Sequence, residues 1–296
     1  MPEQKPVVIT ADSSADLPAD IREEFAIHFL PIYVQLDGTF YQDCVDIFPR
    51  DIYEAFDRRG ILPKTAAPSI GEYQSFFRQF TERGSAVVHL SLNHQMSSCF
   101  RVACLAAEEL EDVHVVDTRS FCTASGMLCV QAARLRDAGL GAADIAARLT
   151  ELRGKIRGYF IPDNLDFISK SGRCSVLAAW GANLLKLRPM VAVDGSTGDL
   201  IIGKKYRGQR VAVYEQFLRD ACAMARDTMD SALAFFMHTP DMAKEEYERY
   251  NALAKELLPH VGRLVTDDVG CTIVSHVGKN CVALITIDAS AQPSGA

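Results

Sequence analysis

The chain has 296 residues, of which 48% are hydrophobic and 23% are charged, and its formal net charge is −7. This composition excludes a fibrous or disordered protein, and the acidic balance disfavours nucleic-acid binding, because contact with phosphates requires a basic face. The nine cysteines are scattered without C-x-x-C spacing, so neither a disulfide framework nor a metal site is predicted. The N-terminus is polar and no apolar run approaches about 18 residues, so we expect a reduced, cytoplasmic protein without a membrane span.

The first half of the chain alternates short β-branched strands with helical patterns. Residues 7–10 predict a strand that leads through Asp12-Ser13-Ser14 into a helix over 18–25, and we expect Asp12 to stabilise this turn. The same order recurs as strand 86–92 with helix 97–110 and as strand 113–116 with helix 124–136. Further helices are predicted over 50–58 and 69–80, which leaves 64–68 as an exposed loop. Repeated β–α alternation predicts a parallel sheet covered by helices.

The second half follows a different pattern. After a helix over 140–153, we expect a strand at 158–161, a helix over about 175–187, and an antiparallel pair, 189–193 and 200–204, joined by a turn. Helices at 209–225 and 241–257 and strands at 232–237, near 271–276 and at 282–287 complete this half. The sequence therefore predicts an α/β fold with two domains: an N-terminal three-layer parallel-sheet domain (1–156) and a C-terminal domain with a mixed sheet (157–288). A polar tail (289–296) follows and is expected to be disordered, whereas the apolar run 176–185, with Trp180, is expected in the core.

Common catalytic and nucleotide-binding motifs are missing. The chain has no G-x-G-x-x-G, P-loop, G-x-S-x-G or H-E-x-x-H motif. Small polar groups instead lie at strand ends and in loops, where ligands of open α/β sheets bind: Ser13, Ser14, Thr65, Asn93, His94, Ser97, Ser98, Ser120, Ser125, Ser275 and His276. Such groups can bind a carboxylate or a phosphate, but the same residue types also cap helices and form turns, so both interpretations stay open.

Several short motifs follow one another between residues 8 and 287. They are ITADSSADLP (9–18), LPIYV (30–34), PKTAAPS (63–69), MSSCF (96–100), KSGR (170–173), GANLLKLRP (181–189), KYR (205–207) and SHVG (275–278). In order and spacing they resemble the motifs of the DegV family over nearly the whole chain. The resemblance implies a protein that binds one long-chain fatty acid in a tunnel between two α/β domains.

The resemblance also implies roles for individual residues. It assigns the fatty-acid carboxylate to four side chains: the hydroxyls of Thr65 and Ser97 and the basic groups of Arg173 and His276. It marks as further head-group neighbours Ala66, Asn93, His94 and Gly126. Arg207 lies in a basic stretch that is typical of a solvated edge, and the resemblance adds partner docking as a candidate role.

Some members of this family carry the acyl chain for a separate ATP-dependent fatty acid kinase that makes acyl phosphate. The resemblance therefore implies a non-catalytic subunit of phospholipid metabolism with no cofactor besides its bound fatty acid. The chain departs from the family at the head group, where Asn93-His94 replaces Ser-Ser and Ala66-Ala67 replaces Ser-Gln. Two alternatives stay open: an acyl or phosphoryl hydrolase or transferase that uses Ser97 with His94 or His276, and a carrier of another anionic apolar ligand.

Overall fold

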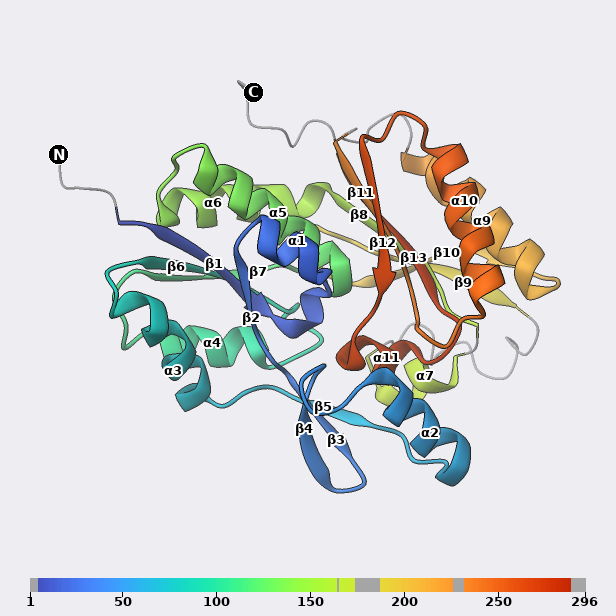
Figure 1. The fold of residues 1–296 in the computed structure, drawn as a ribbon, viewed down its shortest axis with the longest axis horizontal. Coiled ribbons are helices and arrows are strands. Elements are labelled where there is room, and N and C mark those ends of the chain that lie inside the picture. Colours follow the sequence, from blue (N-terminus) through green and yellow to red (C-terminus); the bar gives the residue numbers. More distant parts are fainter. Residues whose placement is uncertain (1–4, 164, 174–186, 226–231, 289–296) are drawn as a thin grey trace.

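A computed structural model describes residues 5–163, 165–173, 187–225 and 232–288. Its first sheet is fully parallel, with the strand order β2-β1-β6-β7 (Figure 1). These strands are β1 (Val7–Asp12), β2 (Ile27–Leu30), β6 (Ala86–Ser91) and β7 (Val113–Asp117). Every residue of β6 is buried, as expected for a central strand covered on both faces.

Helices cover both faces of this sheet. One face carries α3 (Ile70–Thr81) and α4 (Cys99–Ala107), and the other carries α5 (Cys122–Asp137) and α6 (Ala142–Leu152) (Figure 1). The short η1 (Ser13–Ala15) and α1 (Ala19–Glu24) follow β1. Helix α5 also contacts the second sheet, which explains why nearly all of its side chains are buried.

The second sheet is mixed, with the order β10-β9-β8-β13-β11-β12. A short η2 (Arg153–Lys155) leads into β8 (Ile156–Ile161), and the other strands are β9 (Arg188–Val193), β10 (Leu200–Tyr206), β11 (Leu233–His238), β12 (Arg263–Asp268) and β13 (Val282–Ile287). Helices α9 (Arg210–Ala225) and α10 (Lys244–Leu257) pack on its outer face (Figure 1). Only the β11–β12 pair is parallel among the described strands of this sheet. The predicted α/β class, with a parallel and a mixed sheet, is confirmed.

A small third sheet lies between the parallel sheet and the mixed sheet, at one end of the molecule (Figure 1). It contains β3 (Tyr33–Leu36), β4 (Thr39–Gln42) and β5 (Lys64–Ala66), and it adjoins α2 (Pro49–Arg59), α7 (Asp166–Ser171) and α11 (Cys271–Val277). The prediction of an exposed loop at 64–68 was therefore wrong. Residues 64–66 pair with β3, and Thr65 and Ala66 are partly buried.

The segment 271–276 is a helix, so the prediction of a strand there was also wrong. Its β-branched residues favour a strand, but Asp43 accepts hydrogen bonds from the Cys271 backbone N–H at 2.8 Å and from the Thr272 hydroxyl at 2.7 Å. These contacts from a distant loop satisfy donors at the start of α11, as a capping residue would. The strand that precedes it, β12, was not predicted.

Asp12 does not stabilise its own turn. Its carboxylate accepts hydrogen bonds from the Tyr73 and Ser91 hydroxyls at 2.5 and 2.8 Å, and from the Leu92 backbone N–H at 2.8 Å. These hydrogen bonds therefore connect β1 to β6 and α3. The predicted helix 175–187, including Trp180, and the tail 289–296 lie essentially outside the described residues. No helix in the described part of the chain is both long and apolar enough to cross a membrane.

Candidate functional site

A cavity of roughly 380 Å³ lies between the small sheet, α4 and α11. Its lining combines residues from both halves of the chain, including all four predicted carboxylate ligands: Thr65, Ser97, Arg173 and His276. Ala66 also lines it, whereas most of the remaining wall is apolar. The structure thus brings together side chains that are up to 211 positions apart in the sequence.

Thr65 and His276 form the polar centre of this cavity. The Thr65 Oγ1 lies 3.0 Å from His276 Nε2, and the antiparallel pairing of Thr65 with Val34 fixes its position on β5. Burial, together with the nearby positive charge of Arg173, lowers the pKa of His276 to about 4. The imidazole is therefore neutral at pH 7. Its Nδ1 is buried and has no hydrogen-bond partner among the described residues, so no carboxylate orients this ring.

Ser97 and Arg173 line the cavity from different elements, next to α4 and after α7. The Ser97 Oγ accepts a hydrogen bond from the Cys99 backbone N–H at 3.2 Å, so the hydroxyl caps the start of α4 while it lines the cavity. Arg173 follows α7, is exposed, and donates to the Ser171 carbonyl at 2.6 Å. Its guanidinium is thus both a cavity residue and accessible from outside, which suits an anion at the cavity mouth.

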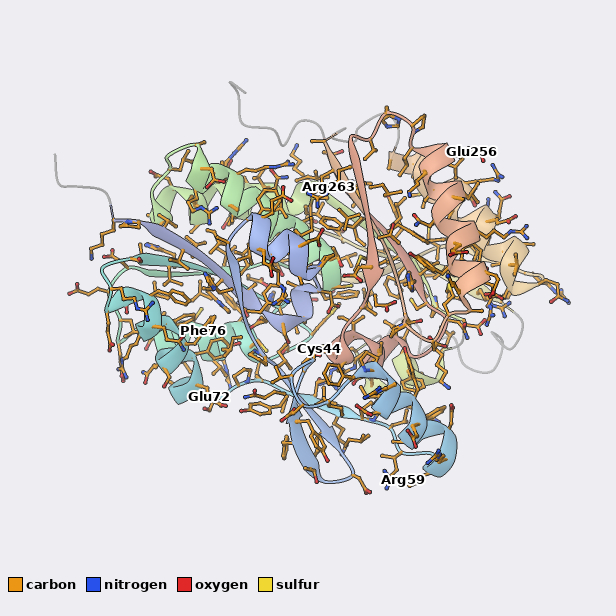
Figure 2. All side chains as sticks on the ribbon, in the orientation of Figure 1. Cys44, Arg59, Glu72, Phe76, Glu256 and Arg263 are labelled. Atoms are coloured by element: carbon orange, nitrogen blue, oxygen red, sulfur yellow. The ribbon has the colours of Figure 1, made fainter. Side chains whose placement is uncertain are left out.

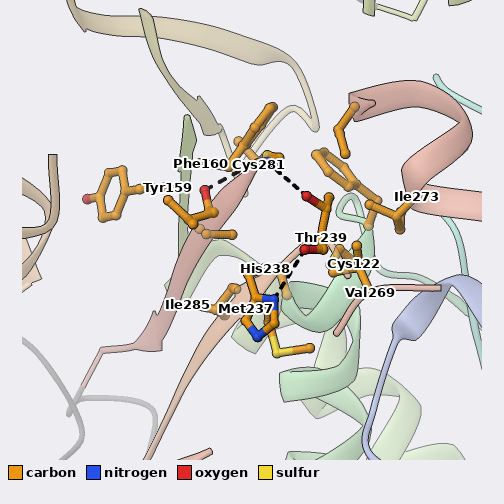
Figure 3. Close-up of a pocket in the computed structure, with 17 residues that line it drawn as sticks. Cys122, Tyr159, Phe160, Met237, His238, Thr239, Val269, Ile273, Cys281 and Ile285 are labelled. Carbon is orange, nitrogen blue, oxygen red and sulfur yellow. Dashed lines mark hydrogen bonds between the residues drawn. The ribbon is translucent and has the colours of Figure 1, made fainter. Parts of the chain in front are cut away.

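A second, smaller space extends the apolar surface of the first (Figure 3). It measures about 40 Å³ and shares four lining residues with the larger cavity: Phe121, Phe160, Ile273 and Val277. Polar groups near it are already satisfied, because the Cys281 backbone N–H donates to Thr239 Oγ1 at 3.0 Å and His238 Nδ1 lies 3.3 Å from the Thr239 carbonyl oxygen (Figure 3). The two spaces together combine the polar groups of the larger cavity with mainly apolar walls.

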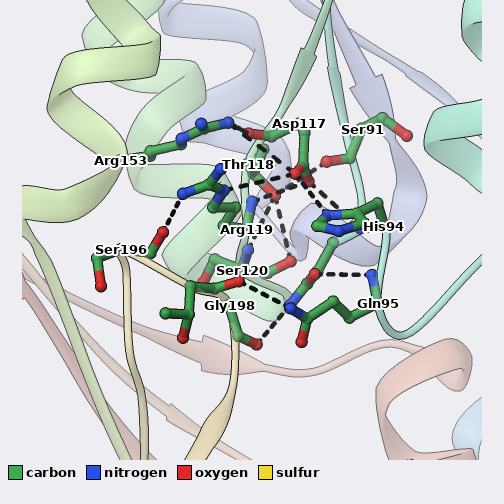
Figure 4. A network of polar contacts seen from close by, with 12 residues as sticks. Ser91, His94, Gln95, Asp117, Thr118, Arg119, Ser120, Arg153, Ser196 and Gly198 are labelled. Atoms are coloured by element: carbon green, nitrogen blue, oxygen red, sulfur yellow. Dashed lines mark hydrogen bonds and ion pairs between the residues drawn. The ribbon is translucent and has the colours of Figure 1, made fainter.

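Asn93 and His94 do not line either space. Asn93 is buried and donates to the Gly198 carbonyl at 2.7 Å, while His94 Nδ1 lies 2.8 Å from Asp117 Oδ2 (Figure 4). These contacts belong to a polar network beside the cavity that joins the ends of β6 and β7 to the turn between β9 and β10. Sequence position alone did not distinguish this role from head-group contact.

Arg119 and Arg153 complete the network around Asp117 (Figure 4). Arg153 donates to the Asp117 carbonyl at 2.8 Å, and both guanidinium groups lie 3.9 Å from its carboxylate. Arg119 also donates to the Ser196 carbonyl. The Asp117 carboxylate is therefore surrounded by positive groups, which explains how it is tolerated in a buried position.

Gly126 and Arg207 also lie outside the cavity lining. Gly126 packs against Ala15 and Leu17, where a Cβ would come within 2.6 Å of the Ala15 carbonyl oxygen. Helix α5 can therefore pack against η1 only because residue 126 has no side chain. Arg207 is exposed beyond the end of β10.

The sequence analysis did not predict that residues 271–277 form a helix that lines the cavity. Four of its residues face the cavity at helical spacing: Thr272, Ile273, His276 and Val277. This i, i+1, i+4, i+5 spacing marks one face of a helix, but the sequence carries no such signal, because nearly every residue of α11 is buried.

Comparison with known proteins agrees with this arrangement. A family model described as "Uncharacterised protein, DegV family" matches residues 6–289. DegV domain-containing protein CPE0026 of Clostridium perfringens is 27% identical, with 98% of this chain and 100% of that protein covered. DegV domain-containing protein Mb2440c of Mycobacterium bovis is 29% identical, with 97% and 99% covered.

Solved structures show the same fold. One, described as "Fatty Acid Binding of a DegV family Protein from Thermus thermophilus", has a TM-score of 0.83 and 26% identity, with 96% of this chain and 99% of that chain covered. DegV of Bacillus subtilis, described as a fatty acid binding protein, has a TM-score of 0.80 and 24% identity, with 96% and 100% covered. The match of the family model over nearly all of the sequence shows that this chain belongs to the DegV family.

Proposed function

We propose that this protein binds one long-chain fatty acid, with its carboxylate held by Thr65, Ser97, Arg173 and His276. The acyl chain occupies the apolar spaces between an N-terminal domain (1–156) and a C-terminal domain (157–288). The observation that carries the proposal is the Thr65–His276 pair, 3.0 Å apart, at the polar end of a cavity whose other walls are mainly apolar. The Thermus thermophilus relative with the same fold is described as fatty acid binding, which supports it.

The donor set suits a carboxylate. A buried carboxylate is costly unless charged or hydrogen-bonding partners compensate for lost hydration, and two hydroxyls, an imidazole and a guanidinium line this cavity. A negative charge beside His276 would raise its pKa above the value of about 4 in the lipid-free protein. The imidazole can then donate a charge-assisted hydrogen bond to the ligand.

The apolar walls supply most of the affinity. Burial of each methylene group contributes roughly 0.8 kcal/mol, and a long-chain fatty acid has more than about a dozen of them. The volume of roughly 380 Å³ lies within the range of small-molecule pockets, about 300–1,000 Å³. The ligand is thus selected by an apolar tail and one anionic end rather than by many polar contacts.

The exposed position of Arg173 supports a role in presenting the carboxylate. We infer that a separate ATP-dependent fatty acid kinase docks at this side of the cytoplasmic protein and phosphorylates the bound carboxylate. Arg207, which is exposed, is a candidate docking residue. The chain itself then acts as a non-catalytic carrier in phospholipid metabolism, with the fatty acid as its ligand and no other cofactor.

The hydrolase alternative has less support. Catalysis by Ser97 needs a neighbouring base that a third group orients, but among the described residues the Ser97 hydroxyl forms hydrogen bonds with the thiol and the backbone N–H of Cys99. His276 is paired with Thr65, and its other ring nitrogen has no orienting partner among the described residues. His94 has an orienting carboxylate in Asp117 but does not line the cavity.

Native mass spectrometry of the purified protein, followed by denaturing extraction, tests the proposal. We expect one equivalent of a long-chain fatty acid, with occupancy lowered in Thr65→Val but not in Thr150→Val, an exposed threonine on α6. Protein that stays free of lipid when offered a panel of fatty acids would refute the proposal. Release of an anion whose mass matches no fatty acid would favour the carrier of another apolar ligand.

Kinase presentation requires a separate assay. The loaded protein is mixed with ATP and the catalytic subunit of a bacterial fatty acid kinase, and acyl phosphate is trapped with hydroxylamine. Product that depends on this protein and falls in Arg207→Ala, with unchanged lipid occupancy, would support docking at Arg207. Formation of acyl phosphate at the same rate without this protein would contradict the carrier role.

A further inference from the structure

A cluster of sulfur and oxygen atoms lies at the start of α11, apart from the lipid cavity. It joins the loop after β4, which contains Asp43 and Cys44, to Cys271, the first residue of α11. One ligand atom from each of these three residues lies within 4.8 Å of the others. Cys44 lies beside α11 in the middle of the molecule (Figure 2). None of these atoms lines the fatty-acid cavity.

Asp16 lies next to this cluster, on the same small volume above Gly270. A Cβ built on Gly270 would lie 2.8 Å from Asp16 Oδ1, 3.1 Å from Cys44 Sγ and 3.2 Å from Asp43 Oδ1. Two oxygens and one sulfur thus surround a single small volume that only glycine leaves free. The donors come from three distant parts of the chain.

The charges in this cluster are not compensated by basic residues. Asp16 Oδ2 is buried and has no hydrogen-bond partner among the described residues, none of whose Lys or Arg side chains forms an ion pair with Asp16 or Asp43. Burial and the neighbouring charge of Asp43 raise the pKa of Asp16 well above its usual range. Buried charges in proteins are paired with a countercharge or coordinate a metal ion.

The thiols add a preference for one class of cation. Hydrogen bonding with Cys44, burial and the charge of Asp43 all raise the pKa of the Cys271 thiol, a shift that a bound cation would reverse. Cys44 has a φ of +55°, a conformation that non-glycine residues seldom adopt and that holds its sulfur beside the cluster. Mixed thiolate and carboxylate donors favour Zn²⁺ over Mg²⁺ or Ca²⁺, which prefer oxygen alone.

We propose that a divalent cation of the Zn²⁺ class binds here to one carboxylate and two thiolates, those of Asp43, Cys44 and Cys271, which leaves the fourth tetrahedral position for a solvent molecule. Tetrahedral Zn²⁺ has Zn–S distances of about 2.3 Å and Zn–O distances of about 2.0–2.2 Å, so its ligand atoms lie roughly 3.3–3.8 Å apart. The present separations of up to 4.8 Å close to these values by rotation of side chains. Each cation that binds releases the two thiol protons to solvent.

The cation would hold the first turn of α11 to the loop after β4. The same helix presents Ile273 and His276 to the lipid cavity, so its position matters for the ligand. The site itself does not depend on the proposed lipid function, because none of its three ligand residues is a predicted fatty-acid ligand.

Titration of lipid-free, chelator-treated protein with Zn²⁺ alone, in competition with a chromophoric indicator, tests the proposal. We expect one equivalent to bind, with release of about two protons, and Co²⁺ to give thiolate-to-metal charge-transfer absorption. Cys44→Gly should weaken binding at least tenfold. This variant preserves folding, because glycine readily adopts the positive φ at residue 44. Cys104→Ser, a partly buried cysteine on α4, is the matched control and should bind as the wild type does.

Zn²⁺ binding should be weakened in Cys271→Ser as well, and circular dichroism verifies that this variant is folded. Equal Zn²⁺ affinity in the wild type and Cys44→Gly would overturn the proposal. The absence of saturable one-to-one binding by fully reduced wild-type protein would overturn it as well.

Discussion

Removal of one hydroxyl group tests the head-group assignment most directly. Thr65→Val keeps the shape of the side chain but deletes the group that lies 3.0 Å from His276 Nε2. A hydrogen bond to a charged group contributes about 1.5–3 kcal/mol, whereas a neutral one contributes about 0.5–1.5 kcal/mol. In the lipid-free protein the variant loses only the neutral bond with His276, so the net loss of binding free energy is about 1–2 kcal/mol.

This loss corresponds to an increase of about 5- to 30-fold in the Kd for a fatty acid at 25 °C. Competition with a fluorescent fatty acid measures it, in wild type, Thr65→Val and Thr65→Ser. The serine variant keeps the hydroxyl and should bind within about threefold of the wild type. Equal affinity in all three proteins would refute the assignment of Thr65 to the carboxylate. An equal loss in both variants would show that the methyl group, which only the serine variant lacks, matters as much as the hydroxyl.

Two further predictions concern stability. Gly126→Ala should lower the free energy of unfolding by about 1–3 kcal/mol, because its Cβ would clash with the Ala15 carbonyl and with Leu17. Chemical denaturation measures this change, and Gly154→Ala is the control, because a Cβ at residue 154 meets nothing within 4 Å. An unchanged denaturation midpoint in Gly126→Ala would contradict the prediction. The pKa of His276 is about 4 in the folded protein, below the value of about 6.5 expected when unfolded, so the stability present above pH 6.5 should be lost as the pH falls toward 4. In His276→Gln, the loss of stability between pH 6.5 and pH 4 should be smaller. Denaturation midpoints measured across this pH range test this, and midpoints of the variant that fall with pH as steeply as those of the wild type would argue against it.

The β–α alternation of the first half was readable from sequence because each element carries its own periodic pattern. Strand β6 and helix α6, for example, can be identified from residues within them. Helix α11 could not, since its β-branched residues favour a strand and the groups that hold its first turn come from Asp43, far away in the chain. Local propensity was overridden there by tertiary hydrogen bonds.

The candidate site, too, was only partly predictable from the sequence. Thr65, Ser97, Arg173 and His276 were singled out through a family resemblance, and all four line one cavity. The resemblance implied that Asn93 and His94 lie next to the head group, but in the structure they belong to a neighbouring polar network and do not line the cavity. Cys44 and Cys271 meet only after folding, so no spacing rule could have paired them.

The contact between the β9–β10 turn and the first sheet rests on backbone recognition. Asn93, Gln95 and Arg119 each donate a side-chain hydrogen bond to a carbonyl group of this turn. Because every residue has a carbonyl, these three hydrogen bonds do not themselves require particular side chains in the turn. Two glycines are required, however: a Cβ at Gly195 would lie 2.6 Å from the Arg153 carbonyl oxygen, and Gly198 has a φ of +88° and a Cβ there would lie 2.9 Å from Asn93 Nδ2. The contact between the two sheets thus depends on the backbone shape of the turn, on its two glycines and on three side-chain donors from the first sheet.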